Sequence, residues 1–278
     1  MKKIVTSLLF AAPLIAGPVA SQAQQAPAPS PYRTRFAVDA PITVGLAGVN
    51  VLGLYLIQQK TGLTDAEVAV LDKNNVPKFD RFVAGKYNES ARTKSDYLFY
   101  GSLAAAPTFL ALVPATRHRY GQVIGLYVQT VATTGALFTM AAGNVYRSRP
   151  LTYSNEASSS QRTRKNATNS FFAGHTATTA TATFFAAKVF NDFHPDSPAR
   201  PYVWGVAAAI PAAVGYYRLQ AGKHFLSDNL LGYAVGASAG ILVPHLHKAG
   251  NGRLSLEPLQ GIDANGHAYS GLLLTKRL

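Results

Sequence analysis

The chain has 278 residues, enough for one large domain or two small ones, and 48% of them are hydrophobic whereas only 14% are charged. Cysteine is absent, which excludes disulfides and thiolate metal sites. The 26 Lys and Arg residues outnumber 13 Asp and Glu residues, and this net charge of +13 favours anionic partners. Because the basic residues form no long run, phosphorylated compounds and acidic lipids are expected partners, and nucleic acid is not.

The N-terminus has the pattern of a bacterial secretory signal peptide over residues 1–23. Two lysines follow the initial Met, residues 4–17 are apolar, and "SQA" at 21–23 is a small-residue cleavage site without cysteine. The Pro- and Ala-rich residues 24–38 are typical of a linker. An uncleaved anchor helix is the alternative interpretation.

Six long segments with few charges follow, and they predict helices. Each exceeds ordinary strand length and lacks strict alternation of apolar and polar residues. The segments are residues 40–59, 97–116, 121–146, 170–189, 201–217 and 229–247. We therefore expect an all-α, multi-helix bundle over residues 39–250. Each segment is long enough to cross a membrane, but the mean hydropathy of +0.07 is low for a protein embedded mostly in lipid. The sequence leaves the number of membrane spans open.

The tail, residues 251–278, differs from the helical part. Its Asn-Gly pair at 265–266 lies between two mixed apolar runs, which is the pattern of a β-hairpin. We therefore predict a small hairpin at the C-terminal end of the bundle.

Three short stretches carry the residues of a predicted active site. Arg149 and Pro150 end the third helix, and Gly174 and His175 open the fourth. The segment "YRLQAGKHFLSD" joins the fifth and sixth helices and contains Arg218, His224 and Asp228. In an antiparallel bundle the 3–4 and 5–6 connections lie at the same end. The three stretches are therefore expected to meet.

These residue types suit an oxyanion. The guanidinium groups of Arg149 and Arg218 match phosphate oxygens, and Gly174 at a helix start lets backbone N–H groups approach an anion. Each feature alone has an ordinary structural explanation, such as a basic residue at a helix end. Their joint occurrence at one end of a bundle favours an oxyanion site.

Two histidines supply the chemistry of this predicted site. His224 and Asp228 are four residues apart and share a helical face if the sixth helix begins there. A carboxylate bonded to one ring nitrogen of His224 would leave the other free to attack phosphorus. His175 is then placed to protonate the leaving oxygen.

Residues 121–247 resemble the superfamily of type 2 phosphatidic acid phosphatases (PAP2) and vanadium haloperoxidases. The third motif of that superfamily, Ser-Arg followed by His and Asp, is matched in spacing by Arg218, His224 and Asp228. The second, Pro-Ser-Gly-His, is matched by Gly174 and His175, and the first by Arg149-Pro150. The sequence departs from these motifs at Ala142 for Lys, Phe172 for Pro, Ala173 for Ser and Tyr217 for Ser.

The resemblance implies a helical-bundle phosphatase that needs no metal and no cofactor. His224 would be the nucleophile that forms a phosphohistidine, Asp228 its orienting partner and His175 the general acid. Arg149, Arg218 and the Gly174 backbone would bind phosphate. The substrate would be a lipid phosphate, an isoprenoid diphosphate or a soluble ester.

Ala142 removes a cation from the family pattern, and three other basic residues are candidates to replace it, namely Arg147, Lys165 and Lys223. One alternative function is a related protein that binds phosphate or lipid headgroups without turnover. Another is a haloperoxidase that holds vanadate in the same pocket. The signal peptide favours an exported protein of the bacterial cell envelope with its active end facing the periplasm. Integral and peripheral membrane association both remain open.

Overall fold

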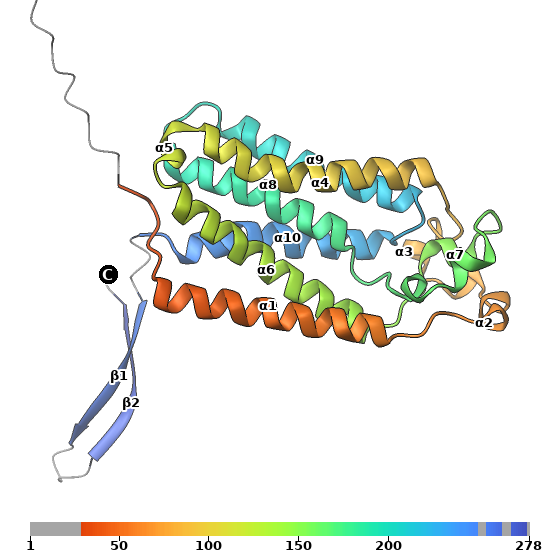
Figure 1. The fold of residues 1–278 in the computed structure, drawn as a ribbon, viewed down its shortest axis with the longest axis horizontal. Helices are drawn as coiled ribbons and strands as arrows, with labels where there is room; N and C mark the ends of the chain where they lie inside the picture. Colours follow the sequence, from red (N-terminus) through yellow and green to blue (C-terminus); the bar gives the residue numbers. More distant parts are fainter. Residues whose placement is uncertain (1–28, 250–253, 263–267, 277–278) are drawn as a thin grey trace, which may run out of the picture.

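The computed structural model describes residues 29–249, 254–262 and 268–276, so the predicted signal peptide and the Asn-Gly turn lie outside the described residues. Residues 29–249 form an all-α bundle of long helices, with most of the short helices gathered at one end (Figure 1). The long helices are α1 (Phe36–Gln59), α4 (Glu89–Leu112), α6 (Tyr120–Asn144), α8 (Gly174–Phe193), α9 (Arg200–Gln220) and α10 (Leu226–Leu246). The predicted fold class and the six predicted helices are confirmed.

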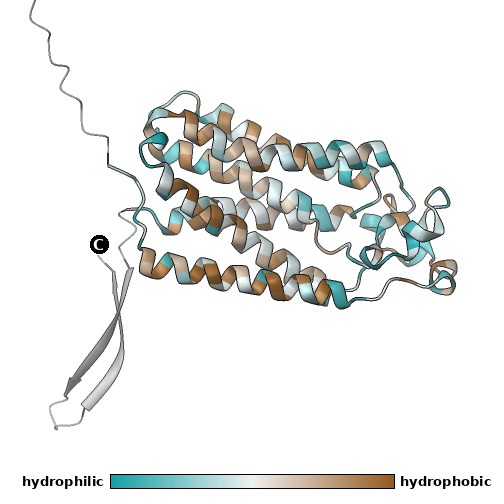
Figure 2. Cartoon of the chain, viewed as in Figure 1, coloured by the Kyte–Doolittle hydropathy of each residue, from teal (hydrophilic) through white to brown (hydrophobic). Residues whose placement is uncertain are grey.

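Short elements occupy the connections between these helices. They are α2 (Asp65–Ala69), η1 (Lys73–Asn75), α3 (Lys78–Arg81), α5 (Pro114–Arg117), η2 (Pro150–Tyr153), α7 (Ser159–Thr163) and η3 (Lys165–Thr168). Most of them cap the end of the bundle where α2, α3 and α7 are labelled in Figure 1. This end is also largely hydrophilic, whereas the flanks of the bundle are rich in hydrophobic residues (Figure 2).

The helix starts differ from the predicted boundaries by one to eight residues, and local contacts explain the differences at α4 and α8. Helix α4 begins eight residues earlier than the predicted start at residue 97, because the side chain of Asn88 caps its polar first turn by accepting from Ala91 N at 2.8 Å. Helix α8 begins at Gly174 rather than at residue 170. Ser170 is instead bound to other segments of the chain: its N–H donates to Arg147 O at 3.0 Å, and its other contacts are described below.

Helix α8 is the centre of the bundle and contacts α4, α6, α9 and α10. Half of its residues are Ala or Thr, so neighbouring helices approach closely. A Cβ atom added to Gly236 of α10 would lie 1.9 Å from the Ala177 carbonyl oxygen, and one added to Gly232 would lie 2.6 Å from that of Ala173. Small residues therefore set the spacing between α8 and α10, which carry predicted site residues at their starts.

Three described helices are long and apolar enough to cross a bilayer, namely α1, α6 and α10. Helix α1 contacts α6 but leaves large apolar side chains exposed, among them Val44 at 70% and Val51 at 66%. An exposed apolar helix of this length fits association with a membrane.

The predicted C-terminal hairpin is present as two antiparallel strands. Strand β1 (Leu254–Ile262) pairs with β2 (Ala268–Lys276), with Leu254 opposite Lys276 and Ile262 opposite Ala268.

Candidate active site

The connections that carry the predicted site residues meet at one end of the bundle, as the antiparallel arrangement predicted. Two backbone hydrogen bonds link the two ends of the connection between α6 and α8. Arg147 N donates to Thr168 O at 2.9 Å, and Arg149 N donates to Ala167 O at 2.8 Å. A further bond, from Leu151 N to Gly222 O at 2.9 Å, joins this connection to the one between α9 and α10. The loops are therefore held together by main-chain bonds, and the site is built on that frame.

His224 is buried in the connection between α9 and α10, with only 2% of its surface exposed. Its Nδ1 lies 2.7 Å from the carbonyl oxygen of Ser170. Because a carbonyl only accepts hydrogen bonds, Nδ1 carries the proton and Nε2 carries the lone pair. Burial, followed by the charges of Arg149 and Arg218, lowers the pKa of His224 well below its usual value. His224 is therefore a neutral imidazole with a nucleophilic Nε2.

Asp228 does not hold the ring of His224, and the expected direct bond between them is wrong. Helix α10 begins at Leu226, so His224 precedes the helix and shares no helical face with Asp228. The carboxylate instead accepts from Ser170 Oγ at 2.7 Å and from Phe225 N at 2.9 Å. Asp228 thus reaches His224 through Ser170, whose hydroxyl binds the carboxylate and whose carbonyl binds the imidazole.

Ser170 is a site residue that the sequence analysis missed. It lies outside the Gly-His stretch, two residues before Phe172, and nothing in the local pattern marks its carbonyl as an acceptor. Complete burial of the side chain and its two contacts identify it only in the folded chain.

Arg147, a candidate replacement for the family lysine, is bound to two carboxylates. It forms ion pairs with Asp228 and with Asp80, the latter at 2.7 Å. Its guanidinium carbon also lies 4.7 Å from the centroid of the Phe225 ring. Asp80 lies in α3, within the connection between α1 and α4, and accepts from Ser227 N at 2.9 Å. Arg147 therefore links the connection between α1 and α4 to the start of α10, and the two carboxylates already neutralise its charge.

The other two candidate cations differ in their surroundings. Lys165 is exposed, and its Nζ donates to the carbonyl oxygen of Gln58 at 3.2 Å. Lys223 is 3% exposed, and its Nζ has no hydrogen bond or ion pair among the described residues. Burial and the charges of Arg149, Arg164 and Arg218 lower the pKa of Lys223 to about 7. Of the three candidates, Lys223 lies within the cluster of site cations.

Arg149 and Arg218 complete this cluster. Arg149 Nη2 donates to Asn169 O at 3.3 Å, and Arg218 Nη1 lies 3.3 Å from Asp96 Oδ1. The Nε atoms of both arginines are buried without a hydrogen-bond partner among the described residues. Burial and the neighbouring charges of Arg218 and Arg164 lower the pKa of Arg149 to about 9. Crowded cations with unpaired N–H groups are suited to an anion.

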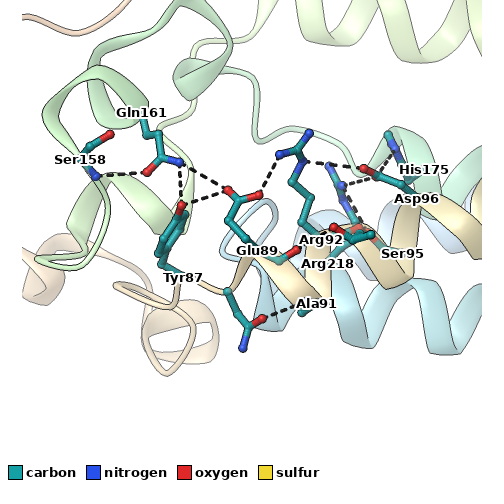
Figure 3. A network of polar contacts seen from close by, with 12 residues as sticks. Tyr87, Glu89, Ala91, Arg92, Ser95, Asp96, Ser158, Gln161, His175 and Arg218 are labelled. Atoms are coloured by element: carbon teal, nitrogen blue, oxygen red, sulfur yellow. Dashed lines mark hydrogen bonds and ion pairs between the residues drawn. The ribbon is translucent and has the colours of Figure 1, made fainter.

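His175 lies in the first turn of α8 and is held by α4. Its Nε2 is 3.1 Å from Asp96 Oδ1, and the same oxygen receives Arg218 Nη1 (Figure 3). The imidazole also packs on Phe99, with the ring centroids 4.3 Å apart. Sequence analysis missed Asp96 because α4 carries no motif.

Gly174 has a packing reason as well as a chemical one. A Cβ atom at this position would lie 2.7 Å from the ring of Phe138, so a larger residue would displace that ring. The preceding residue, Ala173, supplies no side-chain cap to α8. The first N–H groups of α8 are therefore not capped by that side chain.

The main chain of Ala142, the position at which the family has a lysine, is bound by a lysine from a distant segment. Ala142 is fully buried, and its carbonyl oxygen accepts from Lys60 Nζ at 2.9 Å. Lys60 follows α1 and also donates to the carbonyl oxygen of Val145 at 2.8 Å. Burial and the charge of Arg149 lower the pKa of Lys60 to about 8. Lys60, at the start of the connection between α1 and α4, thus binds main-chain oxygens at the C-terminal end of α6.

Within the described part of the chain, no group of three or more His, Asp or Glu side chains is arranged to hold a metal ion. Fold and site together define a helical bundle with two histidines and a cluster of cations at one end. Residues 123–251 match the family model of the PAP2 superfamily, so this part of the chain is a domain of that superfamily. Neither the curated proteins nor the solved structures gave a match. Helices α1 and α4 lie outside the matched residues.

Proposed function

We propose that the protein is a metal-independent phosphatase that hydrolyses a phosphomonoester or a diphosphate through a phosphohistidine. Membership of the PAP2 superfamily supports phosphatase chemistry at the level of the family. The observation that carries the proposal for this chain is the buried, neutral His224 with Nδ1 bonded to Ser170 O at 2.7 Å, beside the cluster of cations.

In the first step, Nε2 of His224 attacks phosphorus, and the bond from phosphorus to the leaving oxygen breaks as the P–N bond forms. Arg149, Arg218 and Lys223 bind the non-bridging oxygens and stabilise their charge in the transition state. Protonated His175 gives its proton to the leaving oxygen.

In the second step, His175, now neutral, accepts a proton from water as the water oxygen attacks phosphorus. The P–N bond breaks, phosphate is released and His224 is regenerated. Both steps use the same groups, since the general acid of the first step becomes the general base of the second.

An apolar groove beside the site supports an amphiphilic substrate. The groove has a volume of about 680 Å³ and lies between α9 and α10. Its lining includes the residues that directly follow three site residues in the chain, namely Thr176, Leu219 and Asn229. A phosphate bound by the cations could therefore carry a hydrocarbon chain into the groove, which favours a lipid phosphate or isoprenoid diphosphate over a small soluble ester.

We further propose that the protein acts in the bacterial cell envelope with its active end toward the periplasm. The N-terminal pattern of a secretory signal supports this location. A cysteine introduced in the connection 151–169 tests it, since the chain has no native cysteine. Labelling in intact spheroplasts by a membrane-impermeant thiol reagent is expected. Labelling only after permeabilisation would refute the periplasmic assignment.

The phosphatase proposal is tested with purified protein in the presence of a chelator. We expect hydrolysis of 4-nitrophenyl phosphate that His224→Ala abolishes, and a higher kcat/KM for a long-chain alkyl phosphate than for ethyl phosphate. Binding of inorganic phosphate without turnover of any of these substrates would instead support a protein that only binds phosphate.

A further inference from the structure

One face of α4 forms a wall of the site. Arg92, Ser95, Asp96 and Phe99 are spaced by three or four residues, so they lie along one face of the helix. The network that connects them to His175 and Arg218 is shown in Figure 3, apart from the ring contact of Phe99. This helix lies outside the residues that match the PAP2 superfamily, so its contribution comes from this chain's own fold.

Asp96 is the central residue of this face. Its Oδ1 lies 3.1 Å from His175 Nε2 and accepts from Arg218 Nη1 at 3.3 Å, and its Oδ2 lies 3.7 Å from Arg92 Nε. Arg218 is also held by Ser95 Oγ at 3.4 Å. The carboxylate of Asp96 therefore contacts both the imidazole of His175 at the start of α8 and the guanidinium of Arg218 near the end of α9.

The charges around His175 make this carboxylate important for its protonation. The charges of Arg218 in α9, Arg149 in the connection between α6 and α8, and Arg92 in α4 act on the imidazole of His175, which in turn acts on His224. Burial and the three arginines lower the pKa of His175 to about 3. A group that must donate a proton near neutral pH needs a compensating negative charge, and Asp96 is the carboxylate in contact with it.

We propose that Asp96 is a positioning residue that orients His175 and sustains its protonated form while the substrate is bound. The proposal rests on the phosphatase function and goes beyond it by adding a residue from outside the superfamily domain. When phosphate binds, its negative charge offsets that of the arginines, and Asp96 completes the neutralisation of the imidazolium. His175 then loses its proton to the leaving oxygen, and the neutral ring stays bound to Asp96 through Nε2–H, with the transferred proton coming from Nδ1.

Two readouts separate this role from a merely structural one. The first is the dependence on leaving group, because 4-nitrophenolate leaves without much protonation whereas an alkoxide does not. For Asp96→Asn we expect kcat/KM to fall by about 100-fold with an alkyl phosphate and by less than about 10-fold with 4-nitrophenyl phosphate. An equal loss for both substrates would overturn the proposal, because it would place the effect on Arg218 and phosphate binding.

The second readout does not need turnover. The imidazole of His175 is titrated by NMR in the presence of inorganic phosphate, with the signal assigned by its loss in His175→Gln. We expect the proton affinity of His175 to fall at least tenfold in Asp96→Asn, and an unchanged titration would overturn the proposal. If wild-type protein hydrolyses neither substrate, the phosphatase function fails, and this titration still decides whether Asp96 sustains the charge of His175.

Glu89→Gln is the matched control for both measurements. Glu89 lies on the same helix and pairs with the same Arg92 at 2.7 Å, but it contacts neither His175 nor Arg218. We expect this variant to keep the leaving-group ratio and the His175 titration of the wild type. A change as large as that of Asp96→Asn would show that any carboxylate on α4 has the effect, and would overturn a specific role for Asp96.

Discussion

Replacing Asp228 by Asn tests how the carboxylate supports His224. The side chain is fully buried and accepts from Ser170 Oγ, from Phe225 N and from Arg147. Asn keeps one accepting oxygen and introduces an N–H₂ group that faces donors. At least one of the three donors therefore loses its acceptor, and Arg147 loses one of its two carboxylates.

The magnitude follows from these contacts. A hydrogen bond to a charged group contributes about 1.5–3 kcal/mol, and breaking a buried ion pair costs about 3–5 kcal/mol. We expect Asp228→Asn to lower the free energy of unfolding by about 4 kcal/mol. Asp196→Asn is the control, because Asp196 is exposed and its substitution should change the stability by less than about 0.5 kcal/mol.

The assay is denaturant unfolding of the purified protein followed by circular dichroism, combined with a double-mutant cycle with Ser170→Ala. Because Ser170 connects Asp228 to His224, the two substitutions should be coupled by about 1–2 kcal/mol. If Asp228→Asn loses less than about 1 kcal/mol and yet abolishes activity as completely as His224→Ala, Asp228 acts on the imidazole directly. That result would refute the connection through Ser170.

Two further predictions test the packing and the cation cluster. Gly236→Ala should lower the free energy of unfolding by about 3 kcal/mol, because its Cβ would lie 1.9 Å from a backbone oxygen of α8. Gly205→Ala is the control, since no atom lies within 4 Å of its added Cβ. In the same urea titration it should be neutral or stabilise the protein by up to about 1 kcal/mol. Lys223 has a pKa of about 7 and is therefore charged below and neutral above that pH, so sulfate affinity measured by calorimetry should fall between pH 6 and 8 in the wild type. Lys223→Met should bind sulfate more weakly at pH 6 and lose most of this pH dependence, and an unchanged profile would exclude Lys223 from the anion site.

The sequence by itself determined the helical fold and the location of the site. The apolar segments are longer than ordinary strands and lack alternation, which favours helices, and an antiparallel order of six helices places the connections between the third and fourth and between the fifth and sixth helices at one end. The spacing of Arg218, His224 and Asp228 was visible because it is local in the chain. The Asn-Gly pair similarly predicted two paired strands, since the signal for a hairpin is contained in a few adjacent residues.

Only the tertiary structure decided which groups touch. The partner of His224 is a main-chain carbonyl, and every residue has one, so no side-chain pattern could select Ser170. Asp96 in α4 and Lys60 just after α1 lie in segments that carry no motif, at separations of 79 and 82 residues from the groups they contact, His175 and Ala142. The start of α10 at Leu226, fixed by the capping bond from Phe225 N to Asp228, separates His224 from the helical face on which the sequence had placed it. Contacts between distant segments depend on how helices pack, and the small residues of α8 and α10 set that packing only once the chain is folded.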